Sequence, residues 1–185
     1  HGFKSWGAAP DFNFFGGNSE MRGYDYLEFI GQNTFYLNAE LRFPLIEAML
    51  TPIGVLGGIR GVLFANMGGA SFAGQPFKTW TSETGFYTPT IGYQTNLQRQ
   101  TLDPIQGPLT AVEGFRLVDA RASYGLGLET FVLGFPVHFD WAWRTLFNKQ
   151  WEDVLFATEA FQAGVASGSA WFRDPRVALW IGYDF

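Results

Sequence analysis

The sequence predicts an all-β chain, and three observations favour a transmembrane antiparallel β-barrel over a soluble β fold. First, no apolar run is long enough for a membrane-spanning helix, and apolar residues recur at every second position of several segments instead. Second, the chain is rich in aromatic residues, with 20 Phe, 7 Trp and 7 Tyr. Third, short and long connections alternate between the segments, as in bacterial outer-membrane barrels.

Composition excludes several other classes of protein. The length of 185 residues fits one domain. A charged fraction of 16% and a net charge of −5 argue against a disordered chain and against a nucleic-acid binder. Because the chain has no cysteine, disulfide scaffolds, zinc–thiolate sites and cysteine nucleophiles are excluded. The chain begins at His1 without a leader-like segment, so we expect a processed or truncated product.

The first predicted strand, residues 34–43, shows the alternation most clearly. Every odd position in it is apolar, and every even position can form hydrogen bonds. The same pattern recurs in residues 176–185. There the apolar face consists of Val177, Leu179, Ile181, Tyr183 and Phe185. Both segments have the length that crosses a bilayer when a strand is tilted.

Three further strands are predicted near residues 58–68, 117–131 and 136–144. In the last of them Val137, Phe139, Trp141 and Trp143 oppose His138, Asp140, Ala142 and Arg144. Across the five strands the polar face carries charges along its middle, and the apolar face is tipped with Trp and Tyr. This arrangement is typical of a lipid-facing band around a wet lumen.

The connections between the strands differ in length. Residues 44–57 and 132–135 are predicted as short connections, whereas 70–116 and 145–175 are long, and the second long connection contains a predicted short amphipathic helix at 151–161. A soluble sandwich or a lipocalin-type barrel would also show alternating strands. Long loops between neighbouring strands fit that alternative poorly, but the pattern alone leaves it open.

An ordered set of motifs resembles the bacterial surface antigen family, which contains the outer-membrane assembly and secretion barrels BamA and TamA. Residues 16–24, Gly-Gly-Asn-Ser-Glu-Met-Arg-Gly-Tyr, are similar to the family's Gly-Gly, three residues, Val/Leu/Met-Arg-Gly-Phe/Tyr signature. Pieces similar to the family's last five strands follow in order, at residues 38–44, 64–68, 123–128 and 134–137 and in the aromatic terminal strand. The resemblance covers nearly the whole chain.

The resemblance implies roles for individual residues. The loop motif Gly16, Gly17, Met21, Arg22, Gly23 and Tyr24 would lie at the tip of an extracellular loop folded back into the lumen. Arg22 would meet the inner wall at Glu40 and at position 66, where the family has Asp and this chain has Asn66. An amide accepts a hydrogen bond but supplies no charge, so we expect the loop to be held less firmly.

The resemblance also implies the domain organisation. Residues 1–185 would be the C-terminal part of one barrel, with residues 1–33 as the lumen loop and the terminal strand as the signal read by the folding machinery. Five strands cannot close a barrel, so further strands of the same barrel are required. In the family the barrel has sixteen strands and is preceded by periplasmic POTRA domains.

The expected function is outer-membrane protein assembly, insertion or polypeptide translocation. The alternative is a structural anchor or scaffold barrel that keeps the family fold without translocase activity, and Asn66 in place of Asp leans towards it. Expected partners are outer-membrane lipid, the remaining strands, a periplasmic POTRA-like or other module, and client polypeptides. The C-terminus would be periplasmic and the long loops extracellular.

Chemical sites were weighed as well. His138 and Asp140 point to the same side of one strand, as a base and its orienting group would, but no Gly-x-Ser-x-Gly nucleophile turn accompanies them. The only other histidine is His1, which argues against a histidine-rich metal site. Gly125-Leu-Gly127 lacks the third glycine of a nucleotide loop. We therefore expect no enzyme, no metal and no cofactor.

Overall fold

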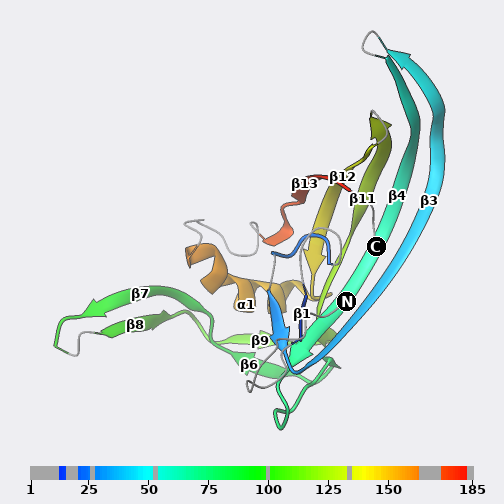
Figure 1. The fold of residues 1–185 in the computed structure, drawn as a ribbon. Helices are drawn as coiled ribbons and strands as arrows, with labels where there is room; N and C mark the ends of the chain where they lie inside the picture. The colour runs from blue at the N-terminus through cyan, green and yellow to red at the C-terminus, as the bar shows by residue number, and fades with distance from the viewer. Residues whose placement is uncertain are drawn as a thin grey trace, which may run out of the picture. The chain divides into compact units, whose positions relative to one another are not determined.

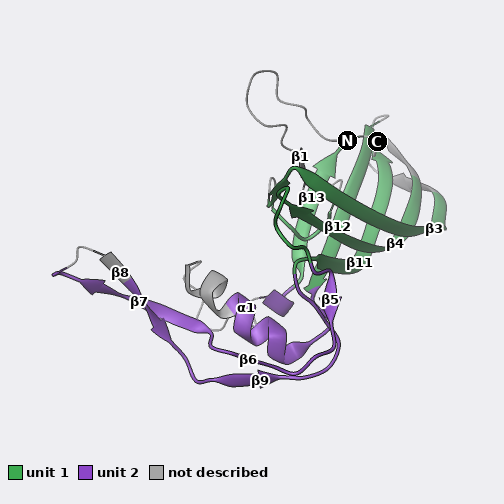
Figure 2. Cartoon of the chain, turned by 90° about the horizontal axis from the view of Figure 1, so that it is seen from below, with its two compact units in different colours: residues 1–77, 119–144, 175–185 green, residues 78–118, 145–174 purple. Residues whose placement is uncertain are grey.

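The computed structural model describes residues 13–15, 21–25, 28–51, 54–98, 101–132, 135–162 and 172–182. The chain divides into two compact units (Figure 2). Unit 1 holds residues 1–77, 119–144 and 175–185, and unit 2 holds residues 78–118 and 145–174. Strands dominate both units, so the predicted all-β fold is confirmed. Among the described residues, no helix has the length and apolar character needed to cross a membrane.

Unit 1 is built on a curved five-stranded sheet (Figure 1). Its order is β13–β12–β11–β4–β3, and the pairs β3–β4, β4–β11 and β12–β13 are antiparallel. The strands are β3 (Asn33–Thr51), β4 (Gly54–Ser71), β11 (Arg121–Val132), β12 (Phe135–Thr145) and β13 (Arg176–Ile181). Within the described residues β3 and β13 each have one strand neighbour in this sheet, so the sheet is not closed.

The five predicted strands all appear, but several boundaries differ. The connection predicted at residues 44–57 is mostly strand, because β3 and β4 stay paired as far as Thr51 and Gly54. Pro44 interrupts the alternation in the sequence, and for that reason the predicted strand stops at residue 43, eight residues before the end of β3 at Thr51. The strand predicted from residue 117 begins at Arg121, since Leu117 belongs to the separate short strand β10 (Arg116–Leu117). Residues 183–185 lie outside the described part of the chain.

The two faces of the sheet differ as the period of two predicts. On β11 the side chains of Tyr124, Leu126 and Leu128 are exposed, while Ser123 and Glu129 on the other face are buried. On β12 the buried set is His138, Asp140, Ala142 and Arg144. Most of the buried polar groups therefore lie on the concave face, together with the apolar cluster of Val62, Phe64 and Ala142, and the convex face exposes apolar side chains.

The N-terminal segment lies against the concave face of the sheet. Strand β1 (Asn13–Phe15) pairs with β2 (Phe29–Gly31), so part of the predicted loop 1–33 is a small ribbon. Met21, Tyr24 and Phe29 form a buried cluster against Tyr36 of β3 and Ala70 of β4. Gly31 allows close approach, because a Cβ at this position would lie 2.6 Å from the carbonyl oxygen of Ser71.

Unit 2 consists of the two long connections between the strands of the sheet. The first forms nested antiparallel pairs, and the second contains the predicted helix as α1 (Lys149–Gln162). The pairs join β5 (Trp80–Thr81) with β10, β6 (Gly85–Tyr87) with β9 (Thr110–Val112), and β7 (Thr90–Asn96) with β8 (Thr101–Gln106). Buried Arg116 of β10 donates to the Glu83 carbonyl and to the Tyr87 hydroxyl, and thereby connects the β5–β10 pair with β6.

Candidate functional site

The tip of the N-terminal segment is a tight turn held against the inner wall. The Tyr24 amide donates to the Met21 carbonyl at 3.3 Å, and Gly23 has a positive φ of 90°. A Cβ at Gly23 would lie 3.0 Å from the Cβ of Ala142, so both the backbone angle and the close packing favour glycine. The Tyr24 hydroxyl donates to the Ala122 carbonyl at 2.9 Å, which fixes the turn to β11.

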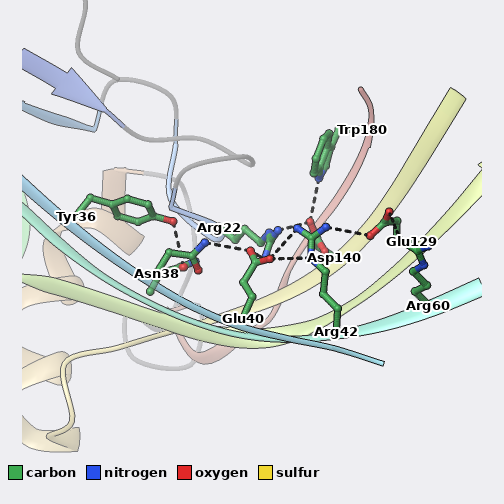
Figure 3. A network of polar contacts seen from close by, with 10 residues as sticks. Arg22, Tyr36, Asn38, Glu40, Arg42, Arg60, Glu129, Asp140 and Trp180 are labelled. Atoms are coloured by element: carbon green, nitrogen blue, oxygen red, sulfur yellow. Dashed lines mark hydrogen bonds and ion pairs between the residues drawn. The ribbon is translucent and has the colours of Figure 1, made fainter. Parts of the chain in front are cut away.

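Arg22, at the centre of this turn, bridges two carboxylates on the wall (Figure 3). Its Nη1 lies 2.7 Å from Oε1 of Glu40 on β3, and its Nε lies 3.3 Å from Oδ2 of Asp140 on β12. The guanidinium also lies over the Phe64 ring, 4.5 Å from its centroid. We call Arg22, Glu40 and Asp140 the arginine clasp.

The position of the two acids explains what the clasp does. Strands β3 and β12 are not neighbours, because β4 and β11 lie between them in the sheet. The curvature of the sheet brings both acids towards one point on its concave side. A planar guanidinium presents several N–H donors in fixed directions, so one arginine can bind both. The loop is thus attached to two separated parts of the wall.

Charges of alternating sign continue from the clasp along the wall. Arg42 Nη2 lies 2.8 Å from Glu40 Oε2, and Arg42 Nη1 lies 3.4 Å from Glu129 on β11. Arg60 on β4 approaches Glu129 at the longer distance of 3.9 Å. Glu40 and Arg42 are two residues apart on one strand and therefore share a face. Each acid in this row has at least one basic neighbour, which offsets the cost of removing it from water.

Asn66, the other partner that the resemblance implies for Arg22, lies on the inner face but binds elsewhere. Its Oδ1 accepts a hydrogen bond from the Tyr36 hydroxyl at 3.1 Å, and the residue is buried. The structure therefore brings Arg22 to Glu40 and not to Asn66. The second carboxylate of the clasp is Asp140, which the sequence pattern placed on the inward face without assigning it to Arg22.

Asp140 also connects the clasp with the terminal strand. Its Oδ2 accepts a hydrogen bond from Nε1 of Trp180 on β13 at 2.9 Å (Figure 3). The Trp180 ring stacks on His138 of β12, with centroids 3.7 Å apart and planes 2° apart. The loop, β12 and β13 are thus linked through one carboxylate.

The surroundings of the clasp suit attachment of a loop. A cavity of about 120 Å³ lies beside it and is lined by Arg22, Tyr24, Asp25, Asp140 and Arg176 among others. In the part of the chain that the structure describes, no group of three or more His, Cys, Asp or Glu side chains could hold a metal ion. His138 lies two residues from Asp140, and its contact is the stacked indole of Trp180.

The remaining predicted site residues fall into two groups. Val177, Leu179 and Ile181 of the terminal strand are 57%, 65% and 68% exposed, on the face away from the clasp. Gly16, Gly17, Tyr183 and Phe185 lie outside the described residues.

Comparison with known proteins gives one result that matches this architecture. The model of the Omp85 superfamily domain matches residues 3–167, which include the loop motif, the clasp and four of the five strands of the sheet. Searches of curated proteins and of solved structures found no match. The match supports the resemblance read from the motifs and implies an outer-membrane location. The chain belongs to the Omp85 superfamily, the outer-membrane β-barrels of protein assembly and translocation.

Proposed function

We propose that this chain is the C-terminal wall and lumen loop of a BamA/TamA-type barrel that inserts or translocates polypeptides. In this proposal the C-terminus is periplasmic, the long connections of unit 2 are extracellular, and further strands of the same barrel close the sheet. Periplasmic POTRA-like modules and client polypeptides are the partners. The protein needs no bond-making chemistry for this work, only a strand edge and a lumen whose loop is held in place.

The observation that carries the proposal is the arginine clasp together with its link, through Asp140 and Trp180, to the terminal strand. An apolar plug would stay in the lumen by burial alone, whereas this loop is attached by a charged side chain bound to two wall strands. Such an attachment is strong when both acids are in place and weak when one of them moves, because a buried charge that loses its partner is costly. A translocating barrel needs a loop that is firmly placed yet releasable.

The terminal strand supplies the second requirement of an insertion machine. Among the described residues β13 is an edge strand of the sheet, paired with β12, and in the proposed barrel its other edge meets the strands that close the sheet, so a client strand would be added at that seam. Exposed strand edges bind extended polypeptides by adding a strand to the sheet. Trp180 donates a hydrogen bond to Asp140, and Asp140 forms an ion pair with Arg22, so the loop and the terminal strand belong to one polar network.

The test is an insertion assay with the complete native protein in liposomes. An unfolded eight-stranded outer-membrane barrel is added, and its folding is followed by the change in gel migration that closed barrels show. We expect faster folding than in empty liposomes and loss of the acceleration in Arg22→Ala. The matched control is Arg60→Ala, since Arg60 is an exposed wall arginine with a long contact to Glu129. No acceleration by the native protein would contradict the proposal.

The alternative, a structural anchor, is favoured by one observation. Asn66 replaces the acid of the family pattern and binds Tyr36, so the wall carries one charge fewer near the loop. An anchor would show the same clasp but would not accelerate insertion. The sequence that precedes this segment also separates the two functions, because POTRA domains argue for assembly and an unrelated module argues for anchoring.

A further inference from the structure

Strand β11 carries two glycines on its concave face. Gly125 and Gly127 are two residues apart, share the face of Ser123 and Glu129, and are both buried. Glycine inside a strand costs stability, because it loses much conformational freedom on folding and has no side chain to pack. Such a position often marks a place where another group approaches the backbone closely. The pair therefore raises the question of which groups lie against it.

The space next to Gly127 is filled by the carboxylate of Asp140 on the neighbouring strand β12. A Cβ at position 127 would overlap Oδ1 of Asp140. Its next contacts would be Cβ of Val62 at 3.4 Å and Cγ of Asp140 at 3.6 Å, which are ordinary packing distances. All three atoms belong to side chains. An alanine at this position would thus leave the backbone of the strands in place and displace one carboxylate.

The backbone at position 127 does not itself require glycine. Gly127 lacks the positive φ that disfavours other residues, whereas Gly23 in the loop has it. It is paired in register with Val62 of β4, so no bulge interrupts the strand there. The contact that excludes a side chain at position 127 is therefore the one with the Asp140 carboxylate.

The displaced carboxylate is the one that completes the arginine clasp. Its other oxygen, Oδ2, lies 3.3 Å from Nε of Arg22 and accepts the hydrogen bond from Nε1 of Trp180 at 2.9 Å (Figure 3). The two oxygens of a carboxylate move together, because the group is planar and rigid. A shift of Oδ1 away from position 127 therefore changes both contacts of Oδ2.

Gly125 leaves room for a second group that contacts Arg22. A Cβ at position 125 would lie 2.5 Å from Cζ of Phe64, and the centroid of this ring is 4.5 Å from Cζ of Arg22. Gly125 and Phe64 are direct partners across β11 and β4. The same Cβ would also overlap the carbonyl oxygen of Trp141, so a substitution here would disturb the backbone of the wall. Gly127 is therefore the position at which an effect on the clasp can be separated from an effect on the sheet.

We propose that Gly127 is a positioning residue for the lumen loop. It acts through Asp140, because the missing side chain leaves the space in which the carboxylate contacts Arg22 and Trp180 together. Strand β11 supplies no member of the clasp, yet in this way it determines whether the clasp can close. The proposal rests on the contacts of the clasp and not on translocation, so it applies equally to an inserting barrel and to an anchor.

Proteolysis of the loop in the complete native protein tests the proposal. Tyr24 is buried while the loop is docked, so the rate of chymotrypsin cleavage after Tyr24, identified by fragment mass, measures release of the loop. We expect Gly127→Ala to raise this rate about tenfold, as the loss of one contact to a charged group would. Gly61→Ala on β4 is the matched control, because a Cβ at Gly61 would lie 2.5 Å from Cζ of Phe43, which is exposed on the convex face. The control should be cleaved at the native rate, and an unchanged rate in Gly127→Ala would overturn the proposal.

Combined variants separate positioning from a general loss of stability. In Asp140→Ala the oxygen that crowds position 127 is gone, so adding Gly127→Ala should change the cleavage rate by less than about twofold. Equal effects of Gly127→Ala with and without the Asp140 carboxylate would show that the glycine serves the strand itself, and would overturn the proposal.

Two further measurements complete the test. Adding Glu40→Ala to Asp140→Ala should raise the cleavage rate again, because Glu40 still holds Arg22 at 2.7 Å. No rise would mean that Glu40 does not hold the loop, and would withdraw the clasp on which the proposal rests. Folding of each variant is followed by the gel migration of the closed barrel. If Gly127→Ala does not fold, we expect Asp140→Ala to restore folding, and failure in both backgrounds would contradict the proposal.

Discussion

Loss of the charge of Asp140 should release the lumen loop without unfolding the wall. Asp140→Asn keeps the size of the side chain and an oxygen that accepts from Trp180, but it removes the carboxylate that lies 3.3 Å from Arg22. The side chains of Arg22 and Asp140 are each only 4% exposed, so solvent does not take over the lost interaction in the docked state. The docked loop is therefore destabilised relative to the released one.

The magnitude follows from what remains bound. Removing one partner of a buried ion pair costs about 3 to 5 kcal/mol when the other charge is left alone. Arg22 keeps Glu40 at 2.7 Å, so the loss of the ion pair with Asp140 should cost less, about 1.5 to 3 kcal/mol, comparable to one hydrogen bond to a charged group. At about 1.4 kcal/mol for each factor of ten, the released population rises about tenfold to a hundredfold.

Cleavage by chymotrypsin after Tyr24 measures that population. Tyr24 is buried, and its hydroxyl is bound to the Ala122 carbonyl, so the peptide bond is protected while the loop is docked. The rate of cleavage in the folded barrel then reports loop release, and the same site is present in every variant below. Asn66→Ala is the matched control, because Asn66 is a buried inner-face residue that binds Tyr36.

Double-mutant cycles measure whether Arg22 interacts with Glu40 and with Asp140. Arg22→Ala combined with Glu40→Ala, and Arg22→Ala combined with Asp140→Asn, should each have less effect than the sum of the single changes. Arg22→Ala combined with Asn66→Ala should be additive. Strict additivity of the Arg22 and Glu40 changes would mean that these residues do not touch, and the assignment of residues 21–24 to the lumen would then be withdrawn.

Three further predictions follow from the same structure. Lysine in place of Leu37, which is exposed on the convex face, should lower the free energy of unfolding by about 2 to 4 kcal/mol near the bilayer midplane, while lysine in place of Asn38 should change it little. Equal losses at the two positions in refolding titrations would contradict the assignment of the convex face to lipid. These 185 residues alone should not give a heat-modifiable monomer in detergent, because two strand edges remain open; a protease-resistant monomer would contradict this. In unit 2, Glu152→Ala should destabilise the turn after β12 by about 1 to 3 kcal/mol, because buried Glu152 accepts from the Leu146 amide and from Arg173; unchanged protection of the Leu146 amide in hydrogen exchange would refute it.

Local pattern predicted most of the wall because each strand has one wet and one apolar face. The alternation in residues 34–43 and 136–144 fixed both the strands and the faces that β3 and β12 show. It failed where two strands continue without an alternating pattern, since Pro44 and the bulge at Leu45 shift the period by one residue. It also failed in the long connections, where short strands such as β5 and β6 are too brief to show a period.

The candidate site was predictable only in part, and the reason is geometric. A motif can show that Arg22 needs acidic partners, and alternation can show which acids face inward. Neither shows which strands the curved sheet brings together, so Asp140, on the fourth strand of the wall in chain order, carried no sequence signal that linked it to Arg22. Position 66 carries no acid, because Asn66 binds Tyr36 instead. The clasp still has two carboxylates, because Glu40 on β3 and Asp140 on β12 both contact the Arg22 guanidinium. The absence of a charge at Asn66 is then weak evidence against a translocating barrel. The hydrogen bond from Trp180 to Asp140 also links the loop to the terminal strand, and an acid at position 66 of β4 would not provide that link.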